Sequence, residues 1–257
     1  MIDLSQKTVF ITGASSGIGL ACAYAFARQD ARLIIAARRK ERIEALAQEL
    51  NRVHDTEVLT IQLDVRNQPA VEKAVKDLPP NWKDIDVLVN NAGLSRGLDK
   101  LYEGKLEDWE EMIDTNIKGL LYVTRSILPG MVKRNKGHII NIGSIAGHQL
   151  YPAGNVYCAT KFAVKALSEG LRLDLLGTGV RVTSVDPGMV QTEFSQVRFH
   201  GDTERAAAVY QGLQPLSADD VAEVILFCAT RPPHVDVADI IVMPTDQASV
   251  NHAHRTI

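Results

Sequence analysis

Short apolar runs rich in β-branched residues recur along the chain, and each precedes a longer stretch whose apolar positions return at helical spacing. The runs predict strands buried on both faces of a sheet, and the stretches between them predict amphipathic helices. The predicted strands are TVFIT from Thr8, RLIIAA from Arg32, EVLTIQLDV from Glu57, DVLVNNAG from Asp86, GHIINIGS from Gly137, VRVTSVDPG from Val180 and VADIIVMP from Val237. The predicted helices are GLACAYAFARQ from Gly19, KERIEALAQELNRV from Lys40, PAVEKAVKDL from Pro69, WEEMIDTNIKGLLYVTRSILPGMVKR from Trp109, a helix within residues 154–172, and ADDVAEVILFCAT from Ala218.

The alternation of strand and helix determines the fold class. Successive strand and helix units connect by right-handed crossovers, which place parallel strands in one sheet. No internal repeat, low-complexity tract or linker interrupts the pattern. The sequence therefore predicts an α/β fold with one domain over residues 1–257, a Rossmann-type doubly wound parallel sheet with helices on both faces.

One segment departs from the alternation of predicted strands and helices. Residues 189–215, between the sixth strand and the last helix, are long and polar. Long insertions of this kind in α/β enzymes commonly cover a substrate. We expect a substrate lid here, and a C-terminal tail over residues 244–257.

Composition narrows the class of partner. The 257 residues carry a formal net charge of -3, with cationic and acidic side chains mixed along the chain. No basic face for nucleic acid or anionic lipid is apparent, and no apolar stretch predicts a leader or a membrane span. The three cysteines form no CxxC pair, which argues against a disulfide framework or a thiolate metal cage. We expect a cytoplasmic protein with a small-molecule partner.

A glycine-rich loop follows the first strand. Gly13, Gly17 and Gly19 have GxxxGxG spacing and lead directly into a helix. Glycines let the main chain approach a phosphate at a helix N-terminus, where N–H groups and the helix dipole favour negative charge. An ordinary glycine-rich turn is the alternative, but this strand-to-helix junction is where doubly wound sheets bind dinucleotides.

The end of the second strand indicates which dinucleotide binds. NAD sites place an acidic residue there for the ribose 2′-hydroxyl, but this chain has Arg38 and Arg39. Guanidiniums bind a phosphate well, so the sequence predicts NADP. The alternative is that both arginines only flank a solvated helix start.

Tyr157 and Lys161 lie four residues apart on one predicted helix, which puts both polar ends on the same face. Taken alone, this spacing also fits a tyrosine packed on the sheet beside a lysine that reaches water. Further motifs change the interpretation: TGASSGIG from Thr12, NNAG from Asn90, Asn116 in TNIKG, Ser144 in NIGS, and PGMVQTEF from Pro187. Together with YxxxK, and in this order over nearly the whole chain, they resemble the classical short-chain dehydrogenase/reductase family.

The resemblance implies a catalytic set of Ser144, Tyr157, Lys161 and Asn116. Tyr157 would be the general acid/base, because a phenol ionises near working pH only beside a fixed positive charge, which Lys161 would supply. Ser144 would hold the substrate oxygen, and the main chain of Asn116 would hold a water that links Lys161 to solvent.

The resemblance also implies the cofactor site. Ser15 and Ile18 would lie at the pyrophosphate, Asp64 and Val65 at the adenine, Asn91 and Gly93 along the ribose, and Val190 and Thr192 at the carboxamide. The complete predicted set is Gly13, Ser15, Ser16, Gly17, Ile18, Gly19, Arg38, Arg39, Asp64, Val65, Asn91, Gly93, Tyr157, Lys161, Pro187, Gly188, Val190 and Thr192.

Substrate and assembly are also expectations from resemblance. TEFSQVRFHGD from Thr192, with the tail from Val242, resembles the NADP-dependent 3-hydroxy acid dehydrogenases that oxidise serine and allo-threonine. A carboxylate substrate calls for a guanidinium, for which Arg198 is the first candidate and Arg96 the second. The long helices around residues 113–125 and 157–176 imply a homotetramer.

Two further functions stay open: an NADPH-dependent reductase of another small carbonyl, and a non-catalytic NADP sensor, although such a sensor should lack Tyr157, Lys161 or Ser144. No metal site is predicted, because His200, His252 and His254 lack supporting ligands at suitable spacing.

Overall fold

The computed structural model describes residues 2–256, and its strands and helices follow the predicted order. The strands are β1 (Thr8–Thr12), β2 (Arg32–Ala37), β3 (Val58–Gln62), β4 (Ile85–Asn90), β5 (Gly137–Ile142), β6 (Val180–Pro187) and β7 (Asp239–Val242). The helices are α1 (Gly17–Ala27), α2 (Lys40–His54), α3 (Gln68–Lys76), α4 (Leu106–Ile113), α5 (Leu120–Lys133), α6 (Asn155–Asp174), α7 (Phe194–Arg198), α8 (Thr203–Ala208) and α9 (Ala218–Ala229). Shorter helical turns are η1 (Pro80–Trp82), η2 (Asp114–Gly119) and η3 (Ile145–Gly147).

The seven strands form one parallel sheet in the order β3-β2-β1-β4-β5-β6-β7, which confirms the predicted fold class. Phe10 in the centre of β1 pairs with Ile34 of β2 on one side and with Leu88 of β4 on the other. The chain winds outward to β3 and then returns to start again at β4. The connections that follow β1 and β4 run toward opposite edges of the sheet. A crevice therefore opens at the carboxyl ends of these two strands, where ligands bind in such sheets.

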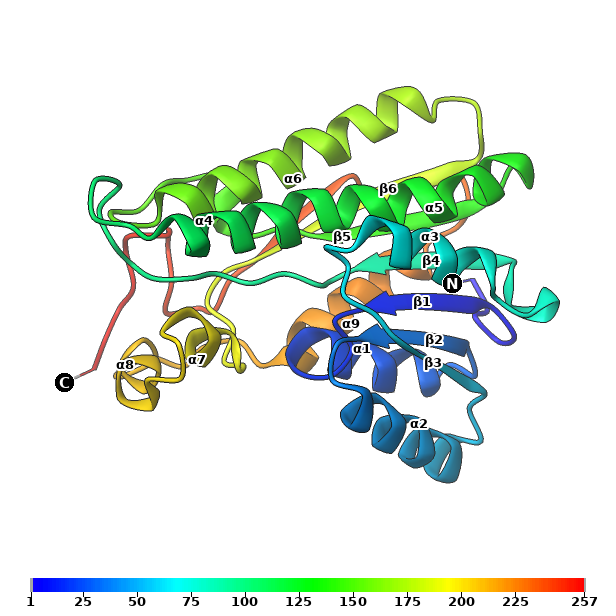
Figure 1. The fold of residues 1–257 in the computed structure, drawn as a ribbon, viewed down its shortest axis with the longest axis horizontal. Coiled ribbons are helices and arrows are strands. Elements are labelled where there is room, and N and C mark those ends of the chain that lie inside the picture. The colour runs from blue at the N-terminus through cyan, green and yellow to red at the C-terminus, as the bar shows by residue number, and fades with distance from the viewer. Residues whose placement is uncertain (1, 257) are drawn as a thin grey trace.

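Helices cover the sheet on both faces (Figure 1). On β1, Val9 and Ile11 point into the core shared with α1, α2 and α9, whereas Phe10 between them points into the core shared with α3 and α5. All three side chains are fully buried. The continuous apolar run in the sequence is therefore explained by a strand that has a hydrophobic core on each side.

One of the two edge strands, β3, corrects an expectation. β3 was expected to be buried on both faces, yet its residues are half-buried or exposed. An edge strand has a neighbour on one side only, and α2 and α3 cover it incompletely through Val58, Leu59 and Ile61. The apolar run alone did not distinguish an edge strand from a central one.

The predicted long helix over residues 109–134 is also divided. It consists of α4, the π-helical turn η2 and α5. A π turn inserts an extra residue into the helical repeat and turns its side chains, and such turns are frequent at functional sites. Here it contains Asn116, which is buried. None of the helices within residues 2–256 has the length and apolar character needed to cross a membrane.

Candidate active site

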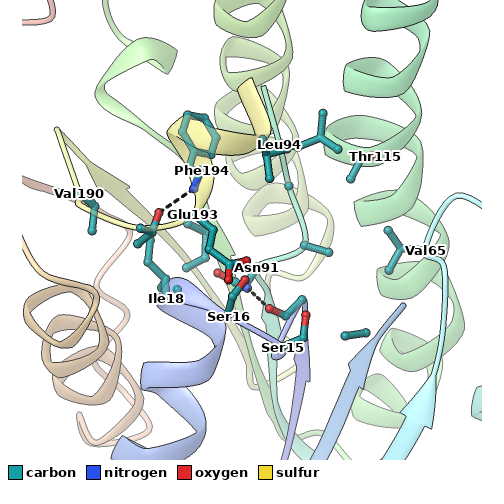
Figure 2. Close-up of a pocket in the computed structure, with 18 of the residues that line it drawn as sticks. Ser15, Ser16, Ile18, Val65, Asn91, Leu94, Thr115, Val190, Glu193 and Phe194 are labelled. Carbon is teal, nitrogen blue, oxygen red and sulfur yellow. Dashed lines mark hydrogen bonds between the residues drawn. The ribbon is translucent and has the colours of Figure 1, made fainter. Parts of the chain in front are cut away.

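A cavity of about 320 Å³ opens at the carboxyl ends of the central strands. Figure 2 shows Ser15 and Ser16, from the loop between β1 and α1, at one end, and Leu94 and Phe194 toward the other. Val65, which follows β3, lies on a third side. Segments distant in the sequence therefore meet at the crevice that the strand order creates.

The structure brings nearly all the predicted cofactor residues into this cavity. Its lining includes every residue of the predicted set except Gly19. A side chain at position 19 would lie 2.4 Å from the Asn91 amide nitrogen and 2.6 Å from the carbonyl oxygen of Gly13, so Gly19 permits close packing beneath the loop. The lining also contains residues that the sequence reasoning did not assign, among them Leu94, Thr115, Glu193, Phe194 and Val197. Glu193 and Phe194 directly follow Thr192 in the recognised motif, which could have pointed to them.

The start of α1 fits a nucleotide diphosphate. Gly13 and Gly17 have φ values of +68° and +54°, which favour glycine. The N-cap residue, Ser16, makes no side-chain cap, and the first turn carries no acidic residue. The N–H groups of this turn therefore lack the usual side-chain acceptor and are available to an anionic ligand.

Arg39 and Arg38 lie at the edge of the cavity. The Arg39 guanidinium donates hydrogen bonds to the hydroxyls of Ser15 and Ser16 and, at 2.7 Å, to the Glu193 carboxylate. Arg42 donates to the same carboxylate at 2.6 Å. Although burial opposes ionisation, these bonds lower the pKa of Glu193 to about 2. The carboxylate that these two arginines bond therefore comes from a distant part of the sequence, within residues 189–215.

A second ion-pair group surrounds Glu111. This carboxylate lies 3.7 Å from Arg38, 3.3 Å from Arg66 and 2.6 Å from Arg96. Arg66 also holds the pKa of Asp64 below its usual value through a 2.6 Å hydrogen bond. Arg96, the second candidate for the substrate carboxylate, donates to Glu111 and to the carbonyl oxygen of Val197, so it already links α4 to α7.

Tyr157 and Lys161 are both buried on α6, at the cavity wall. The Lys161 ammonium donates a 2.8 Å hydrogen bond to the carbonyl oxygen of Ile142 and lies 5.9 Å from the centre of the Tyr157 ring. Burial lowers the pKa of Lys161 to about 8, against the attraction of the Asp186 carboxylate. Burial raises the pKa of Tyr157, while Arg198 and a hydrogen bond to Ser144 act to lower it. The lowering of the Tyr157 pKa by Lys161 stays a prediction.

The side chains of Ser144 and Asn116 are both held by hydrogen bonds to neighbouring segments. Ser144 follows β5, and its hydroxyl accepts the N–H of Ala146 as the cap of η3. The Asn116 side chain bonds both main-chain groups of Leu94, at 2.9 and 2.8 Å, and donates to the hydroxyl of Thr160 at 3.0 Å. Asn116 therefore ties the cavity wall to α6 through its side chain, whereas the predicted main-chain water is not tested.

Arg198 ends α7 close to Tyr157. Its guanidinium carbon lies 5.3 Å from the centre of the Tyr157 ring and 5.0 Å from that of Phe194. One terminal nitrogen donates to the Tyr151 hydroxyl at 3.0 Å. The Nε atom is buried and has no hydrogen-bond partner within residues 2–256. A cation whose buried Nε donor has no partner among these residues thus lies beside the predicted general base.

Two of the three histidines considered in the sequence, His200 and His252, have different side-chain partners. His200 lies 3.1 Å from a carboxylate oxygen of Asp108, and His252 bonds the hydroxyl of Ser249. Three other side chains lie close together: the possible metal-ligand atoms of His148, Asp186 and Asp239 are within 4.8 Å of one another. Asp186 belongs to β6 and Asp239 to β7, so only the sheet brings them together.

Comparison with known proteins gives consistent relatives. The sequence profile of the family described as short chain dehydrogenase matches residues 7–203. The chain is 51% identical over 241 residues to an NADP-dependent 3-hydroxy acid dehydrogenase of Salmonella typhi, covering 93% of this chain and 96% of that protein. It is 45% identical to one of Schizosaccharomyces pombe, covering 99% of both. Among solved structures, the closed form of serine dehydrogenase complexed with NADP+ has a TM-score of 0.92 at 47% identity, covering 97% of this chain and all of that one.

Proposed function

This chain belongs to the short chain dehydrogenase family, and on that basis we propose that it is an NADP-dependent oxidoreductase of small 3-hydroxy acids. It would oxidise the 3-hydroxyl of compounds such as L-serine, L-allo-threonine and 3-hydroxypropanoate, or reduce the corresponding carbonyl. The names of the relatives support this reaction and the cofactor.

One observation carries the substrate class, namely the guanidinium of Arg198 beside Tyr157, whose buried Nε has no hydrogen-bond partner among residues 2–256. An unsatisfied buried donor costs about 1–3 kcal/mol, so a ligand that accepts this hydrogen bond gains that amount. In a 3-hydroxy acid the carboxylate lies two carbons from the hydroxyl-bearing carbon. Such a molecule can offer its hydroxyl to Tyr157 and its carboxylate to Arg198 at once.

The side chains have separate parts in this reaction. Ser144 and Tyr157 hold the substrate hydroxyl, and the Tyr157 phenolate accepts its proton as the C–H bond breaks. Bound NADP supplies the hydride acceptor. Lys161 places a positive charge near the phenolate, and Arg198 fixes the acid so that the reacting carbon stays in line. The α1 N-terminus with Arg38 and Arg39 would hold the cofactor phosphates.

Initial rates with a panel of acids test the function. Purified protein is mixed with NADP or NAD and with L-serine, L-allo-threonine or 3-hydroxypropanoate, and nicotinamide absorbance is followed. We expect reduction of NADP with at least one acid and little reduction of NAD. Tight NADP binding with every acid inert would favour reduction of a different carbonyl.

The role of Arg198 has its own test. Arg198→Ala should raise the KM for the acid by about 10- to 100-fold, since a hydrogen bond to a charged group is worth roughly 1.5–3 kcal/mol. Arg205→Ala is the control, because that guanidinium stacks on Phe199, whereas the guanidinium of Arg198 lies over the ring of Tyr157. An unchanged KM in the Arg198 variant would remove this residue from the substrate site.

We also propose a homotetramer assembled through α5 and α6. Exposed apolar side chains on these helices support it, among them Leu121, Phe162 and Leu173. A cytoplasmic location is proposed as well, which the three buried, unpaired cysteines support.

A further inference from the structure

Asp186 is a buried carboxylate directly behind the cavity. It lies on β6 immediately before Pro187, and 1% of its surface is exposed. One carboxylate oxygen accepts the main-chain N–H of Ser144 at 3.1 Å and the hydroxyl of Ser184 at 2.9 Å. The other lies 2.9 Å from the His148 ring nitrogen. A charge is buried in this way only where several partners compensate its lost hydration.

These contacts hold the segment that carries Ser144. At one end the Lys161 ammonium bonds the carbonyl oxygen of Ile142, and at the other Asp186 bonds the N–H of Ser144. Between them is Gly143, where a Cβ atom would lie 1.6 Å from the Asp186 oxygen. The carboxylate therefore fills the space that a side chain would need, and it fixes the main chain from behind.

The same carboxylate acts electrostatically on Lys161. It raises the pKa of that ammonium against the effect of burial. Two other ionisable groups adjoin Asp186, namely His148 after η3 and Asp239 on β7. Lys165, one turn beyond Lys161 on α6, acts on Asp239. Burial and the nearby Asp186 raise the pKa of Asp239 to about 6, so above that pH two carboxylates lie close together at this point of the sheet.

We propose that Asp186 is a positioning residue for the proposed oxidation: its carboxylate fixes the main chain that carries Ser144, and its negative charge acts on Lys161 across the main-chain segment that both residues bond. The inference rests on the proposed function, because Ser144 and Lys161 act there on substrate and phenolate. Asp186 touches neither reactant and acts through these two residues. His148 and Ser184 hold it in the orientation that faces Ser144.

The central variant is Asp186→Asn, which keeps the shape and removes the charge. In protein labelled at the lysine Nζ, with the signal assigned by Lys161→Met, nuclear magnetic resonance gives the pKa of Lys161 without substrate. The variant should lower that pKa by about one unit, the effect of losing a nearby opposite charge. Asp236→Asn is the matched control, because Asp236 also accepts a β6 N–H, that of Val182 at 3.2 Å. The control should leave the titration of Lys161 unchanged.

The rate against pH supplies the second readout. Asp186→Asn should lower kcat by about 10- to 100-fold, because a neutral amide accepts the hydrogen bonds of Ser144 and Ser184 more weakly than a carboxylate and holds Ser144 less firmly. It should also move the alkaline limb of the profile to lower pH, because Lys161 loses its proton earlier. Loss of rate without a shift of that limb, or a Lys161 pKa equal to that of the wild type, overturns the proposal.

Asp186→Glu serves where the asparagine variant does not fold. It keeps the charge and displaces the carboxylate, so kcat should fall while the pKa of Lys161 stays within the wild-type range. An unchanged kcat, or a lowered pKa, contradicts the proposal. The titration of Lys161 is measured without turnover. Inactivity of the wild type toward every acid would therefore reject the proposed function, and the titration would still decide whether the charge of Asp186 acts on Lys161.

Discussion

Tyr157 and Lys161 are one helical turn apart, and burial moves their pKa values in opposite directions. Removal from water disfavours the charged form of each group, so it raises the pKa of the phenol and lowers that of the ammonium. Positive charge near the phenol must therefore offset burial before the phenol can accept a proton. In residues 2–256, Arg198 already acts on Tyr157 in that direction.

Tyr157→Phe tests the general acid/base role. Without the hydroxyl no proton acceptor remains at the reacting oxygen, so kcat/KM should fall by about 10²- to 10⁴-fold. The dissociation constant of NADPH, measured by its fluorescence, should change little, because the ring and its packing remain. Activity close to that of the wild type would remove Tyr157 from the chemistry.

Lys161 also predicts how stability depends on pH. Its pKa of about 8 in the folded protein lies below the value of an exposed lysine, so the unfolded chain binds the extra proton between these values. The contribution of Lys161 to the free energy of unfolding should be lowest below pH 8 and should increase as the pH rises above 8. Urea unfolding from pH 7 to 10 should therefore show the free energy of unfolding of the wild type increasing relative to Lys161→Met, by up to about 3 kcal/mol. A pH-independent difference would contradict the buried-ammonium interpretation.

At the scale of elements, polar contacts connect the segment around α7 to the elements that it faces. Glu193 bonds Arg39 and Arg42 across the mouth, and the carbonyl oxygen of Val197 accepts from Arg96. Glu193 therefore occupies donors that a ligand phosphate also needs. The position of this segment and the charge of the phosphate site are coupled through one carboxylate.

Glu193→Gln should tighten NADP binding, because a competing negative charge is removed. The carboxylate is partly exposed, so we expect a modest gain of roughly two- to fivefold in affinity. Titration calorimetry measures it, and Glu223→Gln is the control, since Glu223 pairs with Arg28 away from the cavity. Equal or weaker binding by the Glu193 variant would show that this carboxylate does not compete with phosphate.

The elements themselves were largely predictable. Apolar runs such as TVFIT identified strands because a core on each face of the sheet demands them. The apolar pattern alone did not divide the helix over residues 109–134, whereas the structure has a π turn at Asn116, whose side chain bonds Leu94, distant in sequence. Partial exposure of β3 was missed too, since the sequence of an edge strand resembles that of a central one.

At the scale of the molecule, the sheet assembles the site from segments far apart in the sequence. The glycine loop, Arg38, Tyr157 and Lys161 could be assigned from motifs, because each motif carries its own local chemistry. Glu193 facing Arg39, and Asp186 behind Ser144, could not, because these contacts depend on how β2, β5 and β6 lie relative to one another. Local patterns predict the groups, and the fold determines their partners.

The proposed assembly is tested by light scattering coupled to size exclusion. The wild type should have four times the chain mass of 28.2 kDa. Phe162→Glu, which places a charge on the exposed face of α6, should give a smaller species, because a buried unpaired charge opposes association. A monomeric wild type would refute the tetramer.

Transfer of deuterium tests the central claim most directly. The acid that reduces NADP fastest is prepared with deuterium on the carbon that bears the hydroxyl and is incubated with the protein and NADP. We predict that nuclear magnetic resonance finds the deuterium at C4 of the reduced nicotinamide, together with a slower rate than for the unlabelled acid. Reduced cofactor without deuterium, or no reduction with any acid, would contradict hydride transfer from a 3-hydroxy acid.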